Sequence, residues 1–298
     1  MIYRKNALWA VLCLLMFVIS SELKSEDMII IPVKTGGNWG YVNKAGAYVI
    51  SPQFDRAWLF SEGLAPVKTQ GFWGYIDKSG NCVIKPQYDH AWWFSDGLAL
   101  VKSGGFWGYI DRTGNYVISP KFDDALVFSQ GIAPVKTGGF WGFIDKSGNF
   151  VINPQFEDAL VFYEGLAAVK SGGCWGFINR SGKFVISPQF NRTWWFSEGV
   201  APVKKGWNWG FIDRTGKFII SPQFDHAWWF SEGLASVKKG TKWGFIDRTG
   251  KFIISPQFDH AWWFSDGLAP VKKVWKWGFI NKTGNFVINP QFSDIFVY

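Results

Sequence analysis

Short runs of apolar positions separated by polar turns extend along most of the chain, and these runs predict strands rather than helices. Residues 64–68 and 72–77 are apolar and aromatic, and a short turn with a glycine lies between them. A third run begins at Cys82, and Pro86, which lacks a hydrogen-bond donor, is expected to stop it or to place it at the edge of the sheet. Because short turns join antiparallel strands, these residues predict a three-stranded antiparallel meander.

The second of these strands has apolar side chains on both faces. Trp73 and Tyr75 fall on one face, and Phe72 and Ile76 fall on the other. Three short strands cannot bury two faces alone, so neighbouring units are expected to cover them. The segment that follows, residues 89–95, predicts either a helical turn or a fourth short strand.

The same pattern returns every 34 residues, and the dipeptide Trp-Gly marks each copy. Residues 28–298 number 271, against 272 for eight such units, so this region is repeat from end to end. A fixed period in this range is typical of solenoids, propellers and arrays. The tryptophans of Trp-Gly are the expected structural core of the repeats: Trp39, Trp73, Trp107, Trp141, Trp175, Trp209, Trp243 and Trp277.

Three motifs recur in the units: Trp-Gly-aromatic-Ile-Asp-Lys-Ser-Gly, Ile-x-Pro-Gln-Phe-Asp and Phe-Ser-Glu-Gly-Leu-Ala-x-Val. Together they resemble WG-repeat proteins, also called KWG-repeat proteins. The resemblance covers all eight units, and the composite motif is specific. It implies short β-stranded repeats in a mostly bacterial family that has no established common activity. No catalytic residue carries over from it.

The predicted fold is all-β, with tandem 34-residue antiparallel three-stranded units in an elongated repeat array. The alternative is an eight-bladed propeller-like ring, which would need no end caps. A propeller blade usually has four strands and about 40 or more residues. The shorter period of this chain favours the array.

The N-terminal segment differs from the rest and predicts export. Two basic residues precede an uncharged, mostly apolar run over residues 7–19, which is shorter than the ~20 residues of a transmembrane span. We expect a signal peptide over residues 1–20, a short linker over 21–27 and one domain of eight repeats over 28–298. An uncleaved N-terminal anchor is the alternative. The expected location is the periplasm, the cell surface or the medium.

Composition supports strands and offers little for a metal or redox centre. The chain has 20 Trp and 34 Gly against 3 Met and 3 His, a balance typical of strands and tight turns. Three cysteines cannot build a multi-disulfide framework. Cys82 and Cys174 stand at aromatic positions of the repeat, as small apolar substitutes or as partners in one disulfide. We expect no cofactor and no metal.

The repeated acids are expected to build turns. Neither set supplies the isolated carboxylate pair of a glycosidase or the clustered oxygens of a calcium site. Catalysis needs one asymmetric site, and the repeats are nearly uniform, so we expect no enzyme. One set opens the turn after the second strand: Asp77, Asp111, Asp145, Asp213 and Asp247. The other set stands directly before glycine: Glu62, Asp96, Glu164, Glu198, Glu232 and Asp266.

Two further repeated positions bear on function. One holds His90, His226 or His260 and elsewhere Arg or Asp, an exchange that predicts solvent exposure. The other holds Trp pairs that alternate with Leu-Val and Trp-Leu, so at least one ring of each pair is expected in the core. The second ring packs in the core as well or forms a surface row that stacks on sugars. The pairs are Trp92-Trp93, Trp194-Trp195, Trp228-Trp229 and Trp262-Trp263.

Positive charge gathers toward the C-terminal end. The whole chain has a net charge of +8; residues 198–298 carry 13 Lys and Arg against 8 acids, a net of +5. The excess falls mainly in the turns before Trp-Gly, and drift on solvated loops would also explain it. If these turns stack along one edge, they predict a basic, aromatic ligand-binding site: Lys205, Trp207, Lys239, Lys242, Lys273, Trp275 and Lys276.

These observations predict an exported, non-enzymatic β-repeat scaffold. Its expected partner is a protein, or an anionic or glycan polymer, at the cell envelope. A carbohydrate-binding module that uses exposed Trp rows is the alternative. Charge alone would allow nucleic acid, but export argues against it. No integral membrane span is expected after cleavage of the signal.

Overall fold

The computed structural model describes residues 30–43, 47–265 and 267–292. In these ranges the chain forms strands and turns and no helix. The predicted signal peptide, the linker and the start of the first repeat at Met28 lie outside the described residues. Within those described, no helix exists that could span a membrane.

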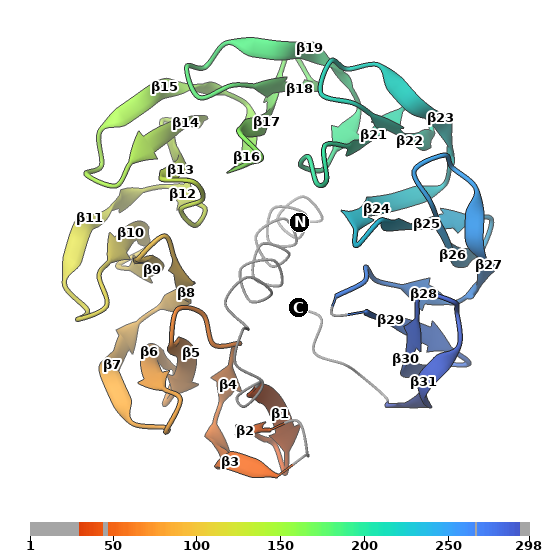
Figure 1. The fold of residues 1–298 in the computed structure, drawn as a ribbon. Coiled ribbons are helices and arrows are strands. Elements are labelled where there is room, and N and C mark those ends of the chain that lie inside the picture. Colours follow the sequence, from red (N-terminus) through yellow and green to blue (C-terminus); the bar gives the residue numbers. More distant parts are fainter. Residues whose placement is uncertain (1–29, 44–46, 266, 293–298) are drawn as a thin grey trace. The chain divides into compact units, whose positions relative to one another are not determined.

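The chain divides into two compact units, and the boundary falls between Gln155 and Phe156. The first unit contains four antiparallel sheets, which follow one another in chain order (Figure 1). Their strands are β1 (Ile31–Thr35), β2 (Asn38–Val42), β3 (Tyr48–Phe54); β4 (Arg56–Ala57), β5 (Leu64–Thr69), β6 (Phe72–Asp77), β7 (Cys82–Tyr88); β8 (His90–Ser95), β9 (Leu98–Ser103), β10 (Phe106–Ile110), β11 (Tyr116–Phe122); and β12 (Asp124–Ala125), β13 (Ile132–Thr137), β14 (Phe140–Asp145), β15 (Phe150–Phe156).

The second unit also contains four antiparallel sheets, again in chain order. Each has four strands and the same order of turns as the sheets of the first unit. Its strands are β16 (Asp158–Tyr163), β17 (Leu166–Ser171), β18 (Cys174–Ile178), β19 (Phe184–Phe190); β20 (Arg192–Thr193), β21 (Ala201–Lys205), β22 (Asn208–Ile212), β23 (Phe218–Phe224); β24 (His226–Ser231), β25 (Leu234–Lys239), β26 (Lys242–Ile246), β27 (Phe252–Phe258); and β28 (His260–Ala261), β29 (Leu268–Lys273), β30 (Lys276–Asn281), β31 (Phe286–Phe292).

Seven of the eight sheets among the described residues have four strands, and the first has three. In these seven the predicted three-stranded meander is joined by a fourth strand, which confirms one of the two possibilities given for residues 89–95. The segment after the Pro-Gln-aromatic step forms the first strand of the next sheet, as β4 does by pairing with β5. The third run does not stop at Pro86, because β7 continues to Tyr88, but the other possibility, an edge strand, is confirmed. Proline is tolerated there because β7 is an edge strand.

An antiparallel sheet of four strands in consecutive order is the blade of a β-propeller. The predicted all-β class of tandem antiparallel units is confirmed, and the chain has the β-propeller type of fold given as the alternative to an elongated array. A period of 34 residues is enough for four strands because the first strand is very short in four of the sheets. These short strands are β4, β12, β20 and β28, each of two residues.

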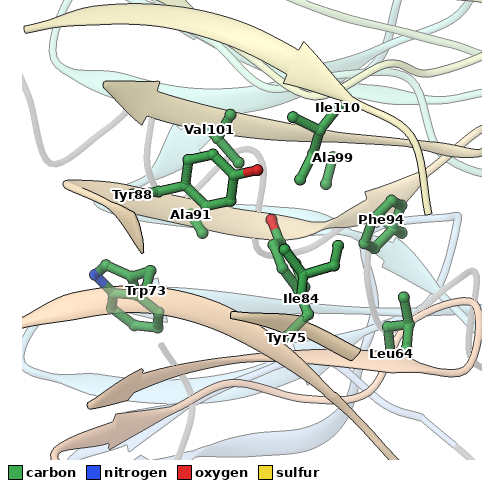
Figure 2. Close-up of a cluster of buried hydrophobic side chains, with 10 residues drawn as sticks. All are labelled: Leu64, Trp73, Tyr75, Ile84, Tyr88, Ala91, Phe94, Ala99, Val101 and Ile110. Atoms are coloured by element: carbon green, nitrogen blue, oxygen red, sulfur yellow. The ribbon is translucent and has the colours of Figure 1, made fainter. Parts of the chain in front are cut away.

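The core lies between successive sheets, which pack face to face. Trp73 and Tyr75 of β6 are 3% exposed or less, and Ile76 on the opposite face of the strand is 2% exposed. The predicted burial of both faces is therefore confirmed along the strand, except at Phe72, which is 49% exposed at its start. Figure 2 shows the cluster between the second and third sheets of the first unit: Leu64, Trp73, Tyr75, Ile84, Tyr88, Ala91, Phe94, Ala99, Val101 and Ile110.

Two hydrogen bonds tie each of several sheets to the next one. The Ser61 hydroxyl donates to the carbonyl of Phe94 at 2.7 Å. The main-chain N–H of Gly97 donates to the Glu62 carboxylate at 3.1 Å. We call the bond from this glycine to the turn acid the clasp. It recurs 34 residues apart in both units, for example between Gly233 and Glu198.

Candidate functional site

The strand register places the turns of each sheet at two opposite ends. In the sheet β20–β23, Arg192 pairs with Lys204, next to the turn that contains Trp207. We call this the tip end. The turns that begin at Glu198 and Asp213 lie at the other end, which we call the clasp end.

All seven residues of the predicted ligand-binding site lie at the tip ends of the last three sheets, and all are exposed. The structure therefore brings them to one end of one unit. Whether they bind a ligand stays a prediction. They are Lys205 and Trp207 in the β21–β22 hairpin, Lys239 and Lys242 in the β25–β26 hairpin, and Lys273, Trp275 and Lys276 in the β29–β30 hairpin.

The tips also present large apolar groups to solvent. Trp207 is 89% exposed, Trp275 82% and Val274 75%. In the β29–β30 hairpin, Val274 and Trp275 have φ angles of 49° and 65°. The residue equivalent to Val274 in the β21–β22 hairpin is Gly206, at a φ of 63°. This conformation costs an L-residue about 1–2 kcal/mol and is most unusual for a β-branched one. A strained turn therefore holds two apolar side chains outward.

Several tip lysines have partners within the protein. Lys242 Nζ lies 2.5 Å from the Asp259 carboxylate, and Lys239 Nζ donates to the Gln223 carbonyl at 2.9 Å. These contacts fix the positions of the two ammonium groups. Only the contact of Lys242 is to a charged group, so the tip lysines together remain positively charged. Three tip lysines place their ammonium groups over phenyl rings, at 5.8–6.0 Å from the centroids. Lys205 lies over Phe218 and Lys273 over Phe286 in the fourth strand of their own sheets, and Lys239 lies over Phe224 in the fourth strand of the preceding sheet.

A second row of lysines lies at the tip end, nearer the sheet interior. This lysine lies near the end of the second strand. The residue opposite it on the first strand differs between sheets. In β12 and β16 the partner is acidic, Asp124 opposite Lys136 and Asp158 opposite Lys170. In the other sheets it is basic or a histidine: Arg56–Lys68, His90–Lys102, Arg192–Lys204, His226–Lys238 and His260–Lys272.

The predicted solvent exposure of the histidines is wrong, because they are half-buried between tryptophans. The His226 ring lies 5.2 Å from that of Trp209 and 5.3 Å from that of Trp243. His260 continues the row between Trp243 and Trp277, at 5.0 and 5.6 Å. Burial, and then nearby positive charges, lower the pKa of His226 to about 4. Sequence reasoning missed this because the enclosing rings belong to two different repeats.

The excess charge of the second unit is concentrated at the tip end. At the clasp end, cations pair with acids: Arg248 with Glu198 at 3.1 Å and Lys282 with Glu232 at 3.0 Å. Among the described residues at the tip end of the last three sheets, two acids, Asp225 and Asp259, stand among nine cations. The nine are Arg192, Lys204, Lys205, Lys238, Lys239, Lys242, Lys272, Lys273 and Lys276.

Both rings of every Trp pair are buried, so no surface row of tryptophans forms from them. The most exposed ring of these pairs is Trp194, at 8%. The rings instead pack against those of the next sheet, as Trp195 does on Trp229 at 4.6 Å. The carbohydrate-binding alternative that relied on exposed Trp rows is therefore wrong about these residues. Residue type alone could not show whether both rings of a pair are buried or whether one of them lies on the surface.

The repeated acids build turns, as predicted. Asp213 Oδ1 accepts hydrogen bonds from the N–H groups of Thr215 and Lys217, at 2.9 and 3.1 Å. The hydrogen bond from the Thr215 hydroxyl is the main reason that the pKa of Asp213 lies below its usual value. The described acids before glycine form the clasps, a role that the sequence did not indicate. Within the described ranges, no group of three or more His, Cys, Asp and Glu side chains could hold a metal ion.

The family described as "WG containing repeat" matches most of the chain. The matched residues are 39–71, 73–105, 107–139, 141–173, 175–206, 209–243, 243–273 and 277–298. This chain belongs to the WG-repeat family. The resemblance predicted from the motifs is thereby confirmed.

Solved structures similar to this WG-repeat protein share its fold at low identity. A eukaryotic initiation factor is 9% identical, with a TM-score of 0.59 over 89% of this chain and 88% of that one. The dihydro-heme d1 dehydrogenase NirN is 13% identical, with a TM-score of 0.55 over 88% and 73%. Hsv2 of Kluyveromyces lactis, with one loop replaced by a linker, is 9% identical, with a TM-score of 0.50 over 74% and 89%. The curated proteins contain no match.

The two residues that name the WG repeat have separate roles. Five of its eight tryptophans are buried and three are half-buried, and they form the predicted structural core. The glycine lies where the fourth strand bulges over the third. A Cβ on Gly108 would lie 2.6 Å from the Ile118 carbonyl oxygen and 2.7 Å from the Pro120 nitrogen. Close approach of backbone, rather than crowding by aromatic rings, therefore requires glycine.

The cysteines of the WG repeats are both unpaired. Cys82 is exposed at the start of β7, and Cys174 is half-buried at the start of β18. The structure thus favours their interpretation as substitutes for aromatic residues over a disulfide between them.

Proposed function

We propose that this WG-repeat protein is an exported, non-enzymatic binding scaffold. It holds a protein, or an anionic or glycan polymer, at the cell envelope through the tip end of its second unit. One observation carries the proposal: among the residues that the structure describes, nine cations stand there against two acids, and the same end exposes Trp207, Val274 and Trp275. Aromatic residues flanked by cations are typical of surfaces that bind macromolecules.

The strained turn at Val274 and Trp275 supports the same surface. Backbone strain is found disproportionately at ligand-binding and switch sites, where it is part of the function. A Gly-Gly turn, as at Gly138 and Gly139 in the first unit, would form the same hairpin without strain or exposed apolar groups. The chain thus carries a cost in stability at a position where two apolar side chains face outward.

Repetition supports the non-enzymatic part of the proposal. The acids recur in turns and clasps, and the tryptophan pairs recur in the core, so these groups have structural roles in several sheets. The export part rests on the apolar N-terminal segment, and mass spectrometry of the mature protein tests it. A mature N-terminus near residue 21 would support export with cleavage, and an intact Met1 on a cytoplasmic protein would contradict it.

The surface is tested with paired variants of the full chain. Trp207→Ser with Trp275→Ser should abolish capture of partners from envelope extracts and on a glycan array. Phe106→Ser with Phe140→Ser is the matched control, because these rings are about half exposed on hairpins of the first unit. Capture that survives the tryptophan changes, or is lost equally in both variants, would contradict the proposed surface.

A further inference from the structure

Two cations oppose each other directly across the first two strands of the sheet β20–β23. Arg192 pairs with Lys204 in the register, and like charges at directly opposite positions destabilise a sheet. The neighbouring sheet shows the compensated arrangement, with Asp158 opposite Lys170. The position therefore accepts an acid, and in this sheet it holds a second cation instead.

Nothing nearby in the described part of the chain neutralises this pair. The ion pairs among the described residues include none of Arg192, Lys204 and Lys238. The residue before Arg192 is the neutral Asn191, whose side-chain oxygen accepts the N–H of Gly206 at 2.7 Å. In the next sheet the equivalent position is Asp225, whose carboxylate is already bound to the N–H of Gly240 at 2.6 Å, so its charge helps to hold that turn.

The aromatic row places the next sheet's cation beside this pair. Lys204 lies opposite Trp209, and the ring of His226 stacks on that of Trp209 at 5.2 Å. His226 lies opposite Lys238. Arg192, Lys204 and Lys238 are thus arranged around one half-buried imidazole, and the charges of all three act on it.

We infer that Arg192, Lys204 and Lys238 form an oxyanion-binding site at the tip end, with His226 beside it. The inference rests on the proposed function, because it names the ligand chemistry of that surface. A guanidinium group can bind a carboxylate, sulfate or phosphate through two parallel hydrogen bonds, and the lysines add point charges. A bound oxyanion would relieve the repulsion between Arg192 and Lys204. Lys272 and His260 repeat the lysine–histidine part of this arrangement in the next sheet, where His226 takes the place of Arg192, so the ligand that fits is a polymer with oxyanions at intervals.

Binding at this site is linked to a proton on His226. The charged groups that face it are His260, Arg192, Lys204 and Lys238, and each lowers the pKa of its imidazole after burial has done so. An oxyanion among the cations offsets their effect and raises this pKa. By linkage, binding takes up protons, and affinity increases as the pH falls from about 6 toward 4.

The test uses the full chain with two probes, inorganic polyphosphate for phosphate groups and polygalacturonate for carboxylates. Binding is measured by titration calorimetry at low and high salt. The decisive variant is Arg192→Asp, which copies the compensated arrangement of Asp158. We expect it to weaken binding of the preferred probe at least about tenfold and to raise the melting temperature without ligand. The control, Lys217→Gln with Lys251→Gln, removes two exposed charges at the clasp end of the same unit.

The outcomes separate this inference from the proposed function. Equal losses in Arg192→Asp and the control would show non-specific attraction and overturn the site. Failure of both probes to bind the wild-type chain would also overturn it, while the scaffold would stand if Trp207 and Trp275 were still needed for capture. Histidine C2–H signals that shift toward higher pKa with the probe support the site. Unmoved histidine signals together with unchanged Arg192→Asp affinity would refute it.

Discussion

The carboxylate of Glu198 accepts a hydrogen bond from the main-chain N–H of Gly233, with 3.2 Å to either oxygen. Glu198 itself has a φ of 54°, a conformation that favours glycine or asparagine. The turn could therefore be built more easily by another residue. Glutamate is retained in the turn because its side chain reaches the next sheet, so one residue closes its own hairpin and joins two sheets.

This double role predicts different effects for two substitutions. Glu198→Ala loses the clasp and the contact to Arg248 but keeps the strained φ. Glu198→Gly loses the same contacts and relieves the strain, by about 1 kcal/mol. In urea unfolding, we expect the alanine variant to be less stable than the glycine variant, and both to be less stable than wild type. Equal stabilities for the two variants would show that strain at Glu198 is negligible.

The Trp-Gly glycine should tolerate no side chain. A Cβ on Gly142 would lie 2.6 Å from the Ile152 carbonyl oxygen and 2.7 Å from the Pro154 nitrogen, and backbone cannot rotate away. Gly142→Val should lower the free energy of unfolding by about 3 kcal/mol or more. Lys136→Ala, on the adjacent strand, should change it by less than half as much. The measurement is chemical unfolding, and similar midpoints for both variants would contradict the close approach.

The phenol hydroxyls of the first unit should contribute to its stability. Tyr75 donates to the carbonyl of Trp92 at 2.7 Å from a buried position, and burial raises the pKa of its hydroxyl. Tyr75→Phe should destabilise the protein by about 1 kcal/mol. Phe211 holds the equivalent position in the second unit, where no hydroxyl is needed, so Phe211→Tyr is the companion variant. If Tyr75→Phe has no effect on the melting temperature, this hydrogen bond adds nothing to folding.

The half-buried histidines should make stability depend on pH. Burial lowers the pKa of His90, His226 and His260 to about 4, below the usual 6.5, so the unfolded chain binds more protons between these values. Stability should be greatest above pH 6.5, fall as the pH drops from 6.5 to 4, and not change further through these groups below 4. Each histidine accounts for a difference of about 3 kcal/mol.

Substitution isolates this effect from that of the carboxylates. His226→Gln should flatten the melting temperature between pH 4 and 6.5 by about a third of the total change. Turn aspartates such as Asp213 have lowered pKa values and act at lower pH, so they do not obscure the comparison. An unchanged slope in the variant would mean that folding leaves the pKa of His226 near its usual value.

The local features of one repeat could be predicted from the sequence, because strands and turns depend on neighbours a few residues away. The Trp-Gly strand and the Asp213 turn are of this kind. The burial of His226 does not follow from the sequence, because its tryptophans lie in two repeats and no single repeat shows them together. The same reason hid the clasp of Glu198. The strained turn at Val274 could have been noticed, since valine stands there where most other repeats have glycine.

The boundaries of the WG repeat do not coincide with those of the sheets. The matched segment 73–105 begins at the third strand of one sheet and ends after the second strand of the next. An in-frame duplication or deletion of 34 codons would therefore restore a complete sheet wherever its endpoints fell. Genes of this kind can gain or lose units without a recombination event at any particular position. Length variation among related genes should thus occur in steps of one whole unit, with no preferred breakpoint.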